Sequence, residues 1–293
     1  MKSLIIDLLA VSAVAVTAGA RAADWSDTAA GVRYGTSFHE PYDNNADGSA
    51  KDIAKTILSL THASGFKYGT NFFNVDVLLS DGNDPGGGVP GNPGAQEVYL
   101  VYRNMIDFGK VGGTPVKGYG VNGLGLTWGI DLNTKNDAYA SKKRMFVIGP
   151  TLMMDVPGFL NLSALLLDES NAPAGIPSRY HYKTHGALEA DWHLPLGSLP
   201  LSFGGYAMYI GSKGLNEFGG PTAPETHIDM KLMWDVGASA GGAKGTFQLG
   251  LAYEYWRNKF GNPTTSAADA VANHTAGPGA TASTPMIRAE YHF

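Results

Sequence analysis

A long alternating stretch, Gly65–Ser80, constrains the fold of this chain more than any other segment. It reads GFKYGTNFFNVDVLLS, and the turn-forming run Asp81–Gly94 follows it at once. One alternate set of its side chains is aromatic and polar and includes Asn74 and Asp76, whereas the other set becomes continuously apolar. In a short soluble strand, such alternation separates a solvent face from a core face. In a strand this long, it predicts a lipid face and a lumen face.

The N-terminus has the features of a cleaved export signal. Lys2 supplies a short positive region, Leu8–Val16 an apolar region, and Ala20-Arg21-Ala22 a cleavage site with small residues. The apolar region is too short for a membrane helix, which needs about 20 apolar residues. We therefore predict a signal peptide at 1–22 and a single exported domain, an outer-membrane β-barrel, at 23–293.

Composition excludes several classes of protein. The formal net charge is −5 and no basic stripe is present, so a nucleic acid polymer is not an expected partner. The chain has no cysteine, which excludes disulfides and thiolate metal sites. The mean hydropathy is −0.10, and no long apolar run follows the export signal, which excludes helical membrane spans. Mean hydropathy does not detect the strands of a β-barrel, because every second residue faces the lumen and can be polar. We expect no cofactor and no bound metal.

Twelve strands are expected, and the segments between them alternate in length. The strands are placed at 29–38, 53–63, 65–80, 96–107, 119–131, 142–154, 160–168, 181–193, 201–210, 225–236, 245–256 and 285–293. Every second connection is long and rich in turn formers, and most of the others are short, with 108–118 as the exception. Barrels with both termini in the periplasm have short periplasmic turns, long external loops and an even strand number. The sequence thus predicts an all-β fold, a 12-stranded antiparallel transmembrane β-barrel.

Charge assigns the two faces of the predicted strands. A lysine or arginine on the lipid side at mid-membrane costs roughly 2–4 kcal/mol, so the charged face must be the lumen face. In the strand at 225–236, the set His227, Asp229 and Lys231 therefore faces the lumen. The last strand alternates in the same way and stops on Phe293, which is typical of the C-terminal signature by which outer-membrane barrels are recognised for assembly.

The first third of the chain resembles a known family. The segments that carry the resemblance are GVRYGTSF at Gly31–Phe38 with Glu40 and Pro41, the segment Asp52–His62, and GFKYGTNFFNVDVLLSDGND from Gly65. They resemble the first strands of the Tsx-like nucleoside-specific channel family. The agreement is best over residues 31–108, and beyond them mainly the strand number and the C-terminal end agree. The resemblance implies a monomeric twelve-stranded outer-membrane barrel with a narrow channel, lined by aromatic and ionisable side chains that bind nucleosides.

Candidate lumen residues follow from the same alternation. A nucleoside has a flat base and a hydroxylated sugar, so a complementary wall would offer aromatic faces and polar groups. The candidates are Arg33, Phe66, Tyr68, Phe72, Asn74, Asp76, Glu97, Tyr99 and Arg103. The alternative is a structural role, because barrel interiors also use charges to tie strands together. Arg103 would then pair with Glu97 or Asp76, and Arg288 with Glu254 or Glu290.

The first functional hypothesis is an outer-membrane channel for nucleosides or similar small polar solutes. It is a monomer in contact with outer-membrane lipid, and it is not an enzyme. One alternative is a non-conducting binding or structural barrel plugged by Gly261–Thr284. Another is an outer-membrane lipid hydrolase, although no G-x-S-x-G accompanies the histidines on the strands. A metal site is not expected, since His181 and His185 would lie about 13 Å apart along one strand.

Overall fold

The computed structural model describes residues 23–293, which form one closed β-barrel. Each long strand pairs antiparallel with its neighbours, and the ring closes where β6 pairs with β7 and where β1 pairs with β13. Twelve long strands make up the ring, as the sequence predicts. A thirteenth strand, β8, is a two-residue extension that pairs only with β7.

The strands of the ring reach from ten to fifteen residues in length. Their bounds are Trp25–Phe38 (β1), Ile53–Phe66 (β2), Gly69–Ser80 (β3), Gln96–Asp107 (β4), Val121–Lys135 (β5), Arg144–Met154 (β6), Phe159–Asn171 (β7), Tyr180–His181 (β8), His185–Pro195 (β9), Leu201–Ile210 (β10), Glu225–Asp235 (β11), Phe247–Arg257 (β12) and Thr281–His292 (β13). Strands of this length suit a bilayer crossing, which takes about 9–11 tilted residues.

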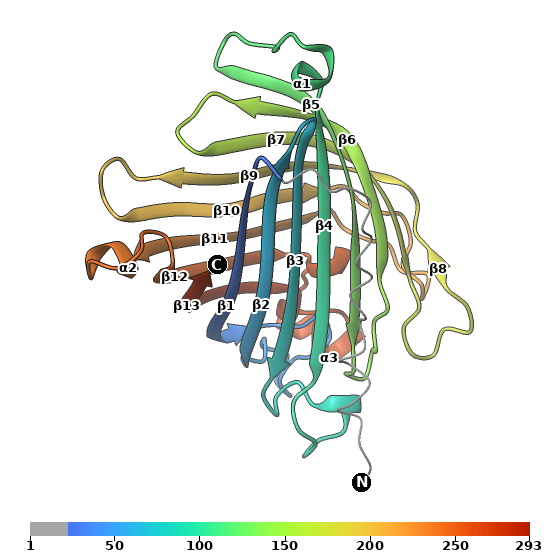
Figure 1. Cartoon of the computed structure of the whole chain (residues 1–293). Helices are drawn as coiled ribbons and strands as arrows, with labels where there is room; N and C mark the ends of the chain where they lie inside the picture. Colours follow the sequence, from blue (N-terminus) through green and yellow to red (C-terminus); the bar gives the residue numbers. More distant parts are fainter. Residues whose placement is uncertain (1–22) are drawn as a thin grey trace, which may run out of the picture.

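The strands are strongly tilted, so β1–β4 and β9–β12 cross at a steep angle in Figure 1. Such tilt accompanies the closure of a sheet into a barrel. In residues 23–293, three short α-helices lie in the connections, α1 (Phe108–Gly112) and α2 (Val236–Ser239) at the turn end and α3 (Ala267–Asn273) at the loop end. Among residues 23–293, no helix is long and apolar enough to cross a membrane.

The outer surface of the ring is apolar and the inner surface carries the charges. Leu188, Leu251 and Ile287 point outward and are 63%, 64% and 64% exposed. Their neighbours along the strands face inward and include the buried Glu254 and Glu290. This order is the reverse of that in a soluble sandwich, and it is the arrangement of a transmembrane barrel with short periplasmic turns and long external loops.

Apolar side chains also fill part of the interior, in two clusters toward the external end. One cluster joins β6, β7, β9 and β10 and consists of Met145, Val147, Leu165, Leu167, Ala187 and Met208. The other joins β1, β2, β12 and β13 and consists of Phe38, Ile53, Ile57, Ala252 and Met286. These inward-facing apolar residues narrow the lumen. A twelve-stranded ring is intermediate between filled eight-stranded barrels and open porins, so a narrow lumen is expected.

The predicted strand at Gly65–Ser80 is wrong at its start. Gly65 and Phe66 belong to the end of β2, Lys67 and Tyr68 form the turn, and β3 begins at Gly69. A side chain at position 69 would have its Cβ 1.8 Å from the carbonyl oxygen of Met105, so only glycine fits where the hairpin packs against β4. The turn therefore lies three residues later than the sequence suggests.

Other predicted boundaries differ by up to four residues, since β1 and β13 begin four residues earlier than expected and β5 ends four residues later. The strand expected at 181–193 is interrupted, since the chain leaves β8 after His181 and pairs again only from His185. The connection at 108–118 is long because it contains α1, whose N-terminal amides bind the Asp107 carboxylate. The predicted signal peptide at 1–22 lies outside the described residues.

Because Leu251 lies on the lipid face, a charged side chain at that position should destabilise the barrel. The substitution Leu251→Arg should lower the free energy of unfolding by about 2–4 kcal/mol, because Leu251 lies in the middle of β12 and its side chain faces outward. The midpoint of urea unfolding in lipid vesicles measures this loss. Leu199→Arg is the matched control, because Leu199 is exposed in a periplasmic turn and should tolerate the charge. Equal losses for both variants would contradict the assignment of the lipid face.

Candidate functional site

An arginine bridge crosses the inside of the barrel. Arg33 on β1 donates one hydrogen bond to Asp76 on β3, at 2.6 Å, and another to Asp229 on β11, at 2.5 Å. We call these three residues the central bridge. Their side chains are 10%, 14% and 10% exposed, so the charges are largely removed from water. Charge-assisted bonds of this kind are stronger than neutral ones, and the bridge joins strands that are not neighbours.

Arg103 forms a separate ion pair on the neighbouring wall. Its guanidinium binds both carboxylate oxygens of Asp131 on β5, with the longer contact at 3.4 Å. Arg103 lies opposite Gly129, which has no side chain to block the guanidinium from reaching along β5. The predicted pairing of Arg103 with Glu97 or Asp76 is therefore wrong. Glu97 lies six residues away on β4, which is about 20 Å along a strand.

The other predicted lumen residues are distributed along the wall. Asn74 accepts a hydrogen bond from Thr61, at 2.7 Å, and Phe72 pairs across the strands with Arg103. Tyr99 accepts one from Lys143, at 3.2 Å. Glu97 is buried near the external end, where Asn133 donates a hydrogen bond to it.

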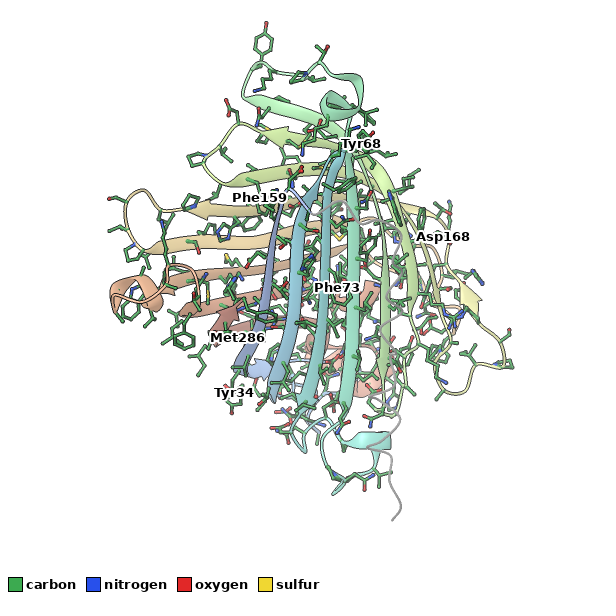
Figure 2. The ribbon with its side chains drawn as sticks, in the orientation of Figure 1. Tyr34, Tyr68, Phe73, Phe159, Asp168 and Met286 are labelled. Atoms are coloured by element: carbon green, nitrogen blue, oxygen red, sulfur yellow. The ribbon has the colours of Figure 1, made fainter. Side chains whose placement is uncertain are left out.

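Two of the predicted lumen residues, Phe66 and Tyr68, do not lie on the inward face of β3. Phe66 ends β2 and shares the outward-facing set with Leu58 and Leu60, since alternate residues of a strand share a face. Tyr68 is an exposed turn residue with the ammonium group of Lys67 4.8 Å from its ring centre. Tyr68 and Tyr34 lie at opposite ends of the front strands in Figure 2. The displaced hairpin turn explains both misplacements.

The main aromatic surface lies on a different wall from the predicted one. A continuous series of rings, which we call the aromatic lane, consists of Tyr206 on β10, His227 on β11, Trp256 near the end of β12 and Phe260 just after that strand. The rings of His227 and Trp256 are stacked, with centroids 3.7 Å apart and an interplanar angle of 5°. Trp256 and Phe260 meet edge to face at 4.8 Å.

The aromatic lane is connected to acidic groups along its length. Trp256 donates its indole N–H to Glu225, at 2.6 Å, and a Glu254 oxygen lies 3.6 Å from His227. Tyr206 stands opposite Asp229 in the strand register, which links the lane to the central bridge. The alternation of 225–236 places His227 on the inner face, but Trp256 is the final residue of its predicted strand. Only the register across β10, β11 and β12 shows that these rings are adjacent.

Two further carboxylates face inward beside the central bridge and the aromatic lane. Glu189 and Asp191 lie on β9, and Asp191 accepts a hydrogen bond from Asn161, at 2.9 Å. Within residues 23–293, neither carboxylate forms an ion pair. In the same part of the chain, no three His, Asp or Glu side chains are grouped so that they could hold a metal ion. The mid-lumen wall therefore offers aromatic faces, paired guanidinium groups and carboxylates free to accept hydrogen bonds.

Comparison with known proteins gives matches only in three dimensions. No protein-family model matches the chain, and no curated protein matches it in sequence. Among solved structures, the KdgM porin is 9% identical with a TM-score of 0.42, over 90% of this chain and 99% of that one. The translocator domain of the autotransporter NalP from Neisseria meningitidis is 11% identical with a TM-score of 0.42, over 94% and 90%. OccK11 (OpdR) of Pseudomonas aeruginosa is 8% identical with a TM-score of 0.39, over 92% and 96%. With TM-scores below 0.5, these likenesses leave function to be argued from the site itself.

The central bridge predicts a large effect of removing its cation. Arg33→Met leaves Asp76 and Asp229 as uncompensated buried charges, so the free energy of unfolding should fall by roughly 3 kcal/mol. The measurement is the urea midpoint of the heat-modifiable band on gels. A triple variant that adds Asp76→Asn and Asp229→Asn should recover most of the loss, because it removes the unpaired charges. Failure of the triple variant to recover stability would show that the bridge does not account for the loss.

Proposed function

We propose that this protein is a monomeric outer-membrane channel that passes nucleosides or similar small polar solutes by facilitated diffusion. The observation that carries the proposal is the mid-lumen wall, where the central bridge and the aromatic lane meet at Tyr206 and Asp229. The proposal includes removal of the leader at 1–22 on export. Facilitated diffusion needs no energy source, only weak sites that a solute enters and leaves easily.

A nucleoside matches this wall in two ways. Its planar base can stack on aromatic rings, and Phe72 and the rings of the aromatic lane supply such faces inside the barrel. Its sugar hydroxyls can donate hydrogen bonds to carboxylates, and Glu189 and Asp191 are free of cationic partners within residues 23–293. The resemblance of residues 31–108 to the Tsx-like family supports the same solute class.

The interior also favours a narrow path over an open pore. The central bridge reaches from β1 to β11, and two apolar clusters line the external half. A narrow lumen brings the solute into contact with the wall, and a series of contacts produces selectivity. Bulk flow of unrelated solutes is therefore not expected.

The same packing supports a second candidate, a non-conducting structural barrel. Several inward side chains are almost fully buried, among them Val147, Met233 and Thr284. A barrel filled in this way along its whole length would carry no current. Conductance distinguishes the two candidates directly.

Planar-bilayer recording of purified protein tests the channel. We expect small single-channel steps that are reduced by added nucleoside, and Phe72→Ala should weaken this reduction roughly tenfold in concentration, because Phe72 is 38% exposed and base stacking contributes about 1–3 kcal/mol. Trp128→Ala is the matched control, because Trp128 lies on the outer surface and bonds Asn104 there. It should leave the nucleoside effect unchanged.

The outcomes separate the parts of the proposal. Current that is indifferent to nucleosides and passes unrelated sugars equally would refute the solute assignment while leaving the channel. The absence of current in folded protein, and in variants designed to widen its mouth, would favour the structural barrel.

A further inference from the structure

A buried ionic cluster lies at the external end of the barrel, apart from the mid-lumen wall. Glu40, two residues beyond β1, receives the ammonium groups of Lys55, Lys135 and Lys259 on a single carboxylate oxygen. We call these four residues the mouth cluster. The Lys259 and Lys135 contacts measure 3.2 and 3.5 Å, and the Lys55 contact is closer. All four residues are buried.

The mouth cluster connects opposite sides of the ring. Lys135 is the last residue of β5, and Lys259 follows β12. Between β5 and β12 lie β6, β7, β9, β10 and β11 in one direction, and β4, β3, β2, β1 and β13 in the other. Strands with five others between them on either side stand across the barrel from each other. Glu40 therefore brings together side chains from opposite edges of the mouth.

Hydrogen bonds also hold the connection between β12 and β13, residues 258–280, against the first external loop, residues 39–52. The backbone N–H of Tyr42 and the side-chain amide of Asn44 both donate to the carbonyl of Ala276, each at 3.1 Å. Asn44 also accepts a hydrogen bond from the N–H of Gly279, at 3.0 Å. Figure 1 shows α3, which belongs to this connection, at the loop end of the barrel. The two loops are thus joined over the mouth by polar contacts.

A surface pocket lies beside these contacts. A cavity of about 400 Å³ lies between the first external loop and α3, with Tyr42, Asn45, Val271 and His274 among its lining residues. At Gly48 the first external loop nevertheless touches α3, because a Cβ there would lie 2.1 Å from the carbonyl oxygen of Ala267.

The charges of the cluster are unequally supported. Lys135 has two further carboxylate partners, Asp84 and Asp137, each at 2.9 Å. For Lys259, Glu40 is the only carboxylate partner within residues 23–293, and its other contacts are the His39 carbonyl and the rings of Trp256 and Phe260. Loss of the contact between Glu40 and Lys259 would therefore leave Lys259 without a carboxylate partner in residues 23–293, while Lys55 and Lys135 stay paired with Glu40.

Glu40 remains charged in this position. Burial raises the pKa of its carboxyl group, but Lys135, Lys259 and Lys55 together lower that pKa well below its ordinary value. An ionised carboxylate with three ammonium neighbours holds them by charge, and loses that hold only when the carboxylate is removed or its partners move away.

We propose that Glu40 acts as an electrostatic latch that holds the 258–280 connection across the external mouth, and that release of Lys259 from Glu40 widens the path into the barrel. The latch rests on the proposed channel function. It adds a restricted external mouth to that function. The Lys259 ammonium group lies 4.7 Å from the ring centre of Trp256, so Lys259 also contacts the outer end of the aromatic lane.

Single-channel recording in planar bilayers tests the latch with two variants. Glu40→Gln removes the charge that holds all three lysines, and Lys259→Met releases only the β12 side while Lys55 and Lys135 stay paired. Each should raise the conductance or the open fraction roughly twofold or more, because the mouth would no longer be restricted. Asp47→Asn is the matched control, since Asp47 is an exposed carboxylate of the same loop that bonds only Ser49.

A cysteine pair offers a rescue. The chain has no cysteine of its own, so Asn44→Cys with Ala276→Cys in the Glu40→Gln background introduces the only thiols. Oxidation should return the conductance to the wild-type level, and a reductant should raise it again. Heat-modifiable mobility on gels verifies that each variant is folded, and Lys259→Met serves as the test if Glu40→Gln does not fold.

The possible results separate the latch from the channel. Larger currents in Glu40→Gln or Lys259→Met than in wild type and Asp47→Asn support the latch, as does a silent wild type with conducting variants. Wild-type currents that neither variant changes overturn the latch and leave the channel standing. Silence of the wild type and of both folded variants overturns the channel, and the latch with it.

Discussion

The structure depends on the need of every backbone N–H and C=O group in a bilayer to find a partner within the protein. A sheet with free edges cannot meet this need in lipid, and a closed ring can. The pairings of β6 with β7 and of β1 with β13 remove the edges and so make the other pairings possible. Once the ring is closed, each strand has one face toward lipid and one toward the lumen, and the charges must gather inside.

This confinement explains the ion pairs of the interior. Arg33, Arg103 and Lys231 face inward, and each finds a carboxylate on another strand. Lys231 and Arg288 share Glu290, which agrees with one of the two pairings predicted for Arg288. These ion pairs link different strands, and they leave some carboxylates of the interior without a cation. Glu189 and Asp191 stay without a cation within residues 23–293, on the wall between β7 and β10.

The sequence was sufficient for the fold because the signals involved are local. Alternation identifies a strand and its faces, and turn-forming runs separate one strand from the next. The hairpin at Lys67 and Tyr68 was misplaced because the decisive contact, Gly69 against the Met105 carbonyl, joins residues far apart in the chain. The aromatic lane was missed for the same kind of reason, since the stacking of His227 on Trp256 depends on the register of β11 and β12. Arg33 and Asp76 were both expected in the lumen, but Asp229 as their shared partner was not.

The central bridge has a further consequence for the shape of the barrel interior. The Arg33 to Asp229 contact divides the cross-section of the barrel unequally, with β12 and β13 on the smaller side. That side is filled by buried groups such as Ala252, Thr284 and Met286. The larger side, bounded by β2 to β10, contains Phe72, which is 38% exposed, and also the buried apolar cluster around Val147 and Leu167. The position of a single guanidinium group therefore sets an off-centre division of the barrel interior, with a filled flank beside β12 and β13.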